Sequence, residues 1–222
     1  CIRDRLGRER RRPIALSAVG TVLVLAFACV LFTLTVLAIQ PGLLSDTLAA
    51  FWEDKLLIPL NIFPVCVVLI VCYCLTGNAF SAAGIGGLVV NLLSYINLVK
   101  TDCRNDPFVP ADCALLREAA NAVGDYQLDL HWGTLAAILL LSAVCFALAY
   151  WSRARKPRWY VRSIMALVVL AVFGASMVKV YPSGDIYDRR GVGTVKVSKS
   201  NVPEVFRLCG FPYCFLHNYN LY

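Results

Sequence analysis

Three long stretches of this sequence contain no charged residue. No Asp, Glu, Lys or Arg occurs in residues 13–40, 56–99 or 131–152. Together with a hydrophobic content of 59% and a mean hydropathy of +0.67, this pattern excludes a single water-soluble globule. It also argues against a proton- or ion-coupled transporter, because ionisable residues within the membrane normally mark such a pathway. We therefore predict an all-α integral membrane protein.

Residues that could act in catalysis or bind a metal are also scarce. The chain has two histidines, His131 and His217, which are too few and too far apart for a dinuclear metal site. No glycine-rich phosphate loop follows a strand pattern, and no nucleophile with suitable partners for phosphoryl transfer can be assembled. The sequence therefore predicts no catalytic residue, metal ligand or cofactor site in this chain.

The charge-free stretches set the number of spans. A membrane helix needs about 20 apolar residues, so residues 56–99 must contain two spans, with Thr76-Gly77-Asn78 as the natural turn between them. A fifth run lies between Arg162 and Lys179, whose charges can reach the two interfaces. We predict a transmembrane domain over 1–181, with spans at about 13–40, 56–75, 79–99, 132–151 and 162–181. An interfacial linker follows at 182–222.

Basic residues are concentrated on one side of these spans. Eleven lie in the N-terminal arm and in the connection between the fourth and fifth spans, whereas the other two connections hold four basic and nine acidic residues. Because cytoplasmic loops retain Lys and Arg, we expect a cytoplasmic N-terminus and an extracellular C-terminus. The net charge of +7 then favours attraction to anionic lipids, and nucleic-acid binding is the weaker interpretation because the charge is divided by the bilayer.

Ten cysteines are present, five of them inside predicted spans, where they act as small apolar residues. Four others lie in the segments expected outside the cell. These four form two possible pairs, Cys103 with Cys113 and Cys209 with Cys214. Each pair could be a disulfide in an oxidising exterior or two free thiols.

The connection after the third span carries the most specific pattern. Lys100 ends an apolar span, and Arg104 offers a planar fork suited to phosphate or carboxylate. One interpretation is that both residues hold an anionic group, either on a lipid or on a docked domain. The other is that they are interfacial anchors that pair locally with Asp102, Asp106 or Asp112. The complete set of candidates in this segment is Asn97, Lys100, Arg104, Asp112 and Tyr126.

Two amphipathic helices are expected outside the spans. Asp112 is expected to cap a helix that lies on the outer leaflet. In the tail, Asn201 and Glu204 form a capping box and Gly210 ends the helix. Aromatic residues after Gly210 suit a belt at the headgroup level: Phe211, Tyr213, Phe215, Tyr219 and Tyr222.

The pattern Asn97-x2-Lys100-x3-Arg104-x2-Pro107-x2-Pro110-x-Asp112, followed by Tyr126, resembles the loop after the third membrane helix in the lipoteichoic acid synthase family. These proteins are phosphoglycerol transferases of the alkaline phosphatase/sulfatase superfamily. A weaker similarity covers the tail, where Gly210, Phe211 and Asn218 look like part of the family's linker to its catalytic domain.

This resemblance implies five membrane helices in a bacterial cell membrane and an extracellular catalytic domain with a threonine nucleophile and manganese or magnesium. None of that domain lies within these 222 residues. The implied partners are phosphatidylglycerol in the membrane and a catalytic domain, either its own or separate. We expect a domain that anchors the enzyme and presents its lipid substrate, and that is inactive alone. The alternatives are a non-catalytic scaffold or accessory subunit, and the membrane region of a phosphoethanolamine transferase.

Overall fold

The structure is a computed structural model that describes residues 17–40, 44–113, 130–152, 157–182 and 202–219. Five of its helices are long and apolar enough to cross a membrane, which confirms an all-α, multi-pass membrane protein. Within the described ranges there is no β-strand. The five helices are α1 (Ala18–Ala38), α3 (Leu57–Thr76), α4 (Ala79–Arg104), α6 (Trp132–Trp151) and α7 (Trp159–Lys179).

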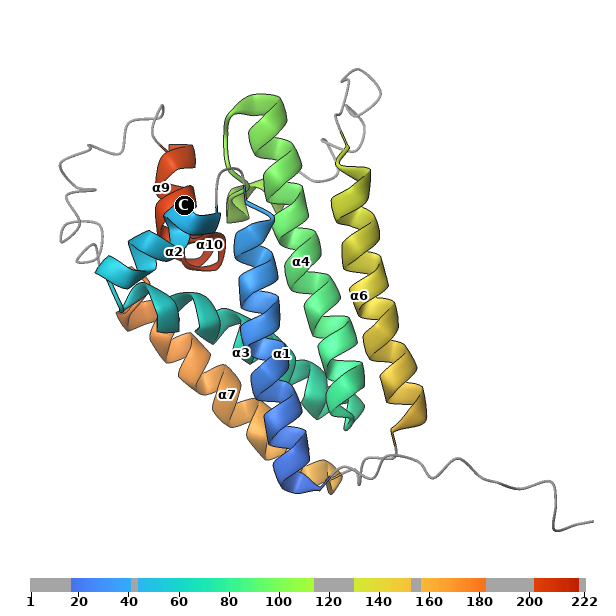
Figure 1. The fold of residues 1–222 in the computed structure, drawn as a ribbon. Helices are drawn as coiled ribbons and strands as arrows, with labels where there is room; N and C mark the ends of the chain where they lie inside the picture. The colour runs from blue at the N-terminus through green and yellow to red at the C-terminus, as the bar shows by residue number, and fades with distance from the viewer. Residues whose placement is uncertain (1–16, 41–43, 114–129, 153–156, 183–201, 220–222) are drawn as a thin grey trace, which may run out of the picture.

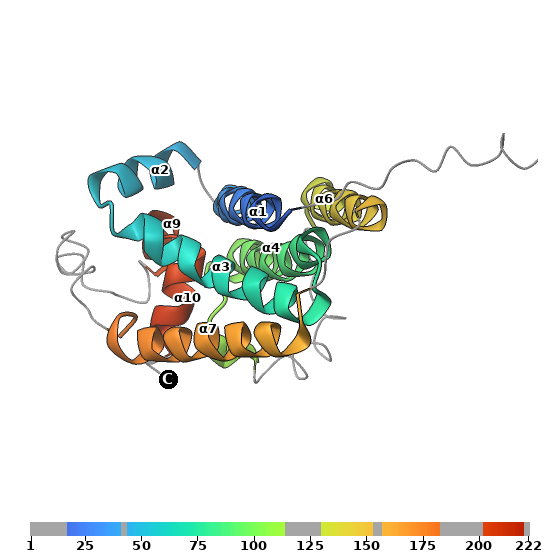
Figure 2. The same cartoon turned by 90° about the horizontal axis from the view of Figure 1, so that it is seen from below.

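Helix α4 is the central element of the bundle. It packs against α1, α3 and α6, while α7 packs against α3 (Figures 1 and 2). The turn from α3 to α4 lies where the sequence predicted it. Gly77 ends α3 in the left-handed region with φ of 69°, and the Asn78 side chain caps α4 by accepting a hydrogen bond from the Phe80 N–H at 2.9 Å.

Small residues allow α4 to approach its neighbours closely. A Cβ added at Gly87 would lie 2.2 Å from the Phe32 ring on α1, and one added at Gly86 would lie 2.8 Å from the Leu69 side chain on α3. The Ser94 hydroxyl also donates to the Val36 carbonyl of α1 at 2.9 Å. The glycine face of α4 therefore fixes its packing against α1 and α3.

A second group of elements covers one end of this bundle, the end at which α1, α4 and α7 finish (Figure 1). We call this group the upper layer. It consists of residues 105–113 together with the short helices α2 (Leu44–Glu53), α9 (Val202–Cys209) and α10 (Phe211–Tyr219). Helix α9 contacts α2, and α10 contacts both α3 and α1.

The C-terminal helices are more deeply packed than the sequence suggested. Gly210 separates α9 from α10 as expected, but Phe211 and Tyr213 are buried in the main core instead of forming an exposed belt. Cys209 and Cys214 are also fully buried, and neither they nor the exposed Cys103 and Cys113 form a disulfide. The aromatic side chains join the tail to the protein because they bury more apolar area there. Asn201, Tyr222 and most of the predicted linker lie outside the described residues.

Candidate functional site

Three of the five residues predicted from the sequence motif lie close together where α4 ends: Asn97, Lys100 and Asp112. Asn105 adopts the left-handed region with φ of 50°, and its N–H donates to the Thr101 carbonyl at 2.8 Å. The chain then folds back along α4, where the buried Asn97 side chain accepts a hydrogen bond from the Phe108 N–H at 2.8 Å. Asn97 therefore holds the returning segment against its own helix.

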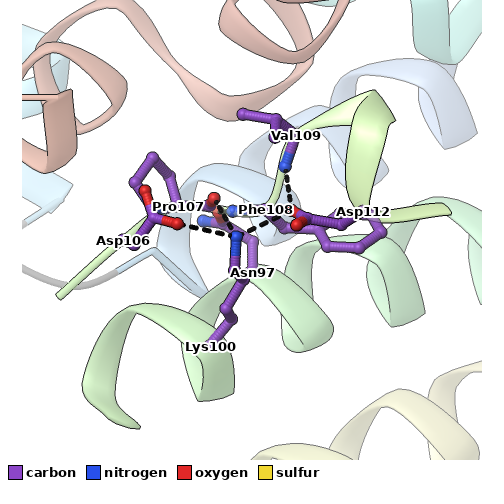
Figure 3. Close-up of polar contacts among 7 residues, drawn as sticks. All are labelled: Asn97, Lys100, Asp106, Pro107, Phe108, Val109 and Asp112. Atoms are coloured by element: carbon purple, nitrogen blue, oxygen red, sulfur yellow. Dashed lines mark hydrogen bonds and ion pairs between the residues drawn. The ribbon is translucent and has the colours of Figure 1, made fainter. Parts of the chain in front are cut away.

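Lys100 lies at the centre of this segment (Figure 3). Its Nζ lies 2.9 Å from Asp106 Oδ2, 2.9 Å from the Pro107 carbonyl oxygen and 2.7 Å from Asp112 Oδ2. The Lys100 side chain is 16% exposed and that of Asp112 is 24% exposed, whereas that of Asp106 is 61% exposed. The contact with Asp112 is therefore the better shielded of the two ion pairs.

These contacts determine what Lys100 can do. A lysine ammonium has three hydrogens, and three acceptors already lie within hydrogen-bond distance. Two carboxylates beside one ammonium also leave a net negative charge around Lys100, which disfavours a further anion. The geometry matches the local-pairing interpretation of Lys100. Arg104 is exposed in the last turn of α4, and Tyr126 lies outside the described residues.

Asp112 caps its helix from a different position than expected. Helical structure begins at residue 110, so Asp112 is not the residue that precedes the helix. Its Oδ2 instead accepts from the Val109 N–H at 2.8 Å, while the Asp112 N–H donates to the Val109 carbonyl at 3.0 Å. The Asp112 side chain therefore supplies one half of a capping box, the bond from the third helical residue back to the N-cap N–H, while the other half is absent because Val109 has no side-chain acceptor. The remainder of the predicted amphipathic helix, at 114–129, lies outside the described residues.

The motif segment and the C-terminal helices form one unit. Phe108 stacks against Phe215 of α10, with ring centroids 5.7 Å apart and planes 15° apart. Phe215 in turn lies beside Phe211, at 5.4 Å. Residues separated by more than 100 positions in sequence therefore share one aromatic cluster, which places the motif segment and the candidate linker residues next to each other.

Asn61 joins α3 to the two C-terminal helices. It is fully buried; its Nδ2 donates to the carbonyls of Leu57 and Cys209, each at 2.8 Å, and its Oδ1 accepts from the Tyr213 N–H at 3.2 Å. Gly210 passes so close that an added Cβ would lie 2.4 Å from Asn61 Oδ1, and its φ is +89°. Gly210 is therefore required both by its backbone conformation and by the approach of Asn61.

Three further polar contacts attach the same helices. With its amide oriented to satisfy both neighbours, Gln40 donates to the Phe206 carbonyl at 3.1 Å and accepts from the Phe211 N–H at 2.7 Å. The Thr47 hydroxyl donates to the Arg207 carbonyl at 2.9 Å. His217 Nδ1 donates to the Tyr181 carbonyl, which links α10 to the end of α7. Of these attachment residues, only Asn61 is conspicuous in the sequence, as a polar residue within an apolar span.

Burial shifts the pKa values of three side chains in and around the C-terminal helices. It lowers the pKa of the His217 imidazole, although the hydrogen bond to the Tyr181 carbonyl acts in the opposite direction. Burial also raises the pKa of both Tyr181 and Tyr213. These groups are therefore neutral at pH 7. Asn218 is bound within α10, where its Nδ2 donates to the Cys214 carbonyl at 2.9 Å.

The described residues contain no group of three His, Cys, Asp or Glu side chains that could hold a metal ion. Their hydrogen bonds and ring contacts attach segments that are distant in the sequence to one another. The chain matches no protein-family model, no curated protein and no solved structure.

Proposed function

We propose that this chain is the membrane domain of a phosphoglycerol transferase similar to lipoteichoic acid synthases, which anchors a catalytic domain and presents phosphatidylglycerol to it at the outer face of a bacterial membrane. The motif of residues 97–112 is the basis for the family assignment. The manganese or magnesium ion and the nucleophile belong to the catalytic domain in this proposal, and the chain alone is inactive.

The observation that most supports this proposal is the attachment of α9 and α10 to the membrane bundle. The three Asn61 hydrogen bonds and the Phe108–Phe215 stack hold these helices in the upper layer. A linker held in this way would keep any domain that follows it at a fixed distance from the membrane surface. A flexible tether would not, because each rotatable connection adds conformational freedom that must be lost when the domain reaches its substrate.

The distribution of charge gives the orientation in this proposal. Helices α1 and α7 both begin at the end of the bundle opposite the upper layer (Figure 1), and in the sequence the basic N-terminal arm precedes α1 and the basic connection precedes α7. The positive-inside rule then places the upper layer outside the cell. A cysteine-accessibility map should place Arg155 in the cytoplasm and both Asp112 and Ser198 outside. Finding Arg155 and Asp112 on the same face would contradict the five-span arrangement.

Activity tests the functional part of the proposal. The purified chain should release no diacylglycerol from phosphatidylglycerol when manganese or magnesium is supplied, because no nucleophile is assembled among its described residues. The gene product that contains this chain should carry out the reaction if a sulfatase-like domain is present. Turnover by this chain alone, abolished by one substitution within it, would refute the proposed division of labour.

Arg104 is the residue in the motif for which we propose an anionic partner, either a lipid phosphate or a carboxylate of the docked domain. In the complete enzyme, Arg104→Ala should reduce polymer synthesis much more than it reduces protein abundance in the membrane. Arg117→Ala is the matched control, since Arg117 is expected on the solvent face of the helix that follows. Equal and small effects of both substitutions would reduce Arg104 to an interfacial anchor.

A further inference from the structure

A cavity of about 430 Å³ lies between α1 and α6, with α4 as its inner wall. Most of its lining is apolar, with contributions from Ile39, Leu98, Ile138 and Leu141. Ala38 of α1 and Ala137 of α6 also line it, and both are exposed on the outside of the bundle. Because α1, α4 and α6 are all membrane-spanning candidates, the cavity faces the lipid.

One polar group in this cavity has an unused hydrogen-bonding position. Asn91 lines the cavity and is 1% exposed. Its Nδ2 donates to the Gly87 carbonyl at 2.8 Å, which fixes the orientation of the amide, while its Oδ1 has no partner within the part of the chain that the structure describes. An amide oxygen can accept two hydrogen bonds, and leaving it unpaired in a hydrocarbon environment is costly.

Three of the polar side chains that line the cavity are already bound to other groups. The Gln40 amide is used by α9 and α10, His131 pairs with Asp102 at 2.7 Å, and the Thr35 hydroxyl donates to the Phe32 carbonyl at 3.0 Å. A single water molecule usually needs two to four polar partners, whereas six of the eleven residues that line the cavity are apolar and three of the polar ones are bound elsewhere. The missing group is therefore a hydrogen-bond donor attached to an apolar molecule.

The depth of Asn91 restricts the chemistry of that donor. Asn91 lies near the middle of α4 and seven residues before Leu98, or about 10 Å below it along the helix axis. A phosphate or ammonium group at this depth would have to be desolvated without a partner of opposite charge. A hydroxyl group is neutral and can donate to Asn91 Oδ1 without that cost.

We propose that the cavity between α1, α4 and α6 binds an uncharged lipid with a free hydroxyl group. The hydroxyl donates to Asn91 Oδ1, and the hydrocarbon chain lies against the apolar walls and leaves between Ala38 and Ala137. This site is independent of the motif at residues 97–112 and does not depend on the proposed enzymatic role.

Photolabelling tests this site with a defined probe. The protein is placed in phosphatidylcholine nanodiscs with a long-chain alcohol that carries a diazirine in its chain, and the labelled peptides are identified by mass spectrometry. We expect labelling of α1 or α6. The methyl ether of the same alcohol cannot donate and should label about five- to tenfold less, which corresponds to the loss of one hydrogen bond. The phosphate ester should label no more than the ether.

Two variants separate the polar contact from the cavity itself. Asn91→Leu should reduce labelling by the alcohol to the level of the ether, and Ala137→Phe, which fills the cavity without changing Asn91, should reduce labelling by both probes. Thr33→Val is the control, since Thr33 is buried on α1 and its hydroxyl donates to the Cys29 carbonyl of its own helix. This variant should be labelled by each probe to the same extent as the wild type. Equal labelling by alcohol and ether, stronger labelling by the phosphate ester, or labelling confined to other helices would overturn the proposal.

Discussion

Gly210→Ala would test how the upper layer is held. A side chain at φ of +89° costs roughly 1–2 kcal/mol for an L-residue. The new Cβ would also lie 2.4 Å from Asn61 Oδ1, so Asn61 would have to move away from Cys209 and Tyr213. Losing those two hydrogen bonds costs roughly 0.5–1.5 kcal/mol each. The substitution should therefore weaken the attachment of α9 and α10 by about 2–5 kcal/mol.

Thiol labelling measures this attachment directly. Cys209 and Cys214 are both fully buried, so a maleimide reaches them only when α9 and α10 detach. If detachment is in rapid equilibrium, each 1.4 kcal/mol increases the labelling rate about tenfold. We therefore expect labelling of both thiols to accelerate at least about 30-fold, with peptide-resolved mass spectrometry separating them from the exposed Cys103 and Cys113.

Gly174→Ala is the matched control. Gly174 lies within α7, and an added Cβ there has no atom within 4 Å. Alanine favours a helix over glycine by up to about 1 kcal/mol, so labelling of Cys209 and Cys214 should not increase. Labelling of Gly210→Ala within about threefold of the wild type would show that Asn61 and Gly210 do not control the attachment.

Three further substitutions probe other parts of the fold. Gly87→Ala should lower stability by about 1–3 kcal/mol through overlap with Phe32, measured as the thermal midpoint in detergent; a midpoint equal to that of the wild type would contradict the close packing. Lys100→Met should speed hydrogen exchange at the Phe108 amide by loosening residues 105–113, whereas the same change at the exposed Lys55 should not. The pKa of His217 is lowered on folding, so the unfolded chain binds more protons as the pH falls through about 6.5. The contribution of His217 to the free energy of unfolding should be fully present above this pH. As the pH decreases below it, this contribution should be lost by at most about 1.4 kcal/mol per pH unit. The loss should be absent in His217→Asn.

Local chemistry in the sequence determined the membrane helices. Charge-free stretches long enough to span a bilayer became helices because a buried backbone must satisfy its own hydrogen bonds. Gly77 and Asn78 marked the turn between α3 and α4 because left-handed backbone and side-chain capping act over only a few residues. The close approach of Gly87 on α4 to Phe32 on α1 could not be identified from sequence spacing, because the two residues belong to different helices.

Only the tertiary structure decided which distant groups meet. Asn61 lies about 150 positions before the Cys209 carbonyl and the Tyr213 N–H that it binds, and no local periodicity encodes that pairing. Both interpretations of Lys100 were compatible with the sequence, and the turn at Asn105 brings Asp106 and Asp112 to its ammonium group. The unpaired oxygen of Asn91 is a property of the assembled α1, α4 and α6 helices, because whether a polar atom finds a partner depends on every segment that surrounds it.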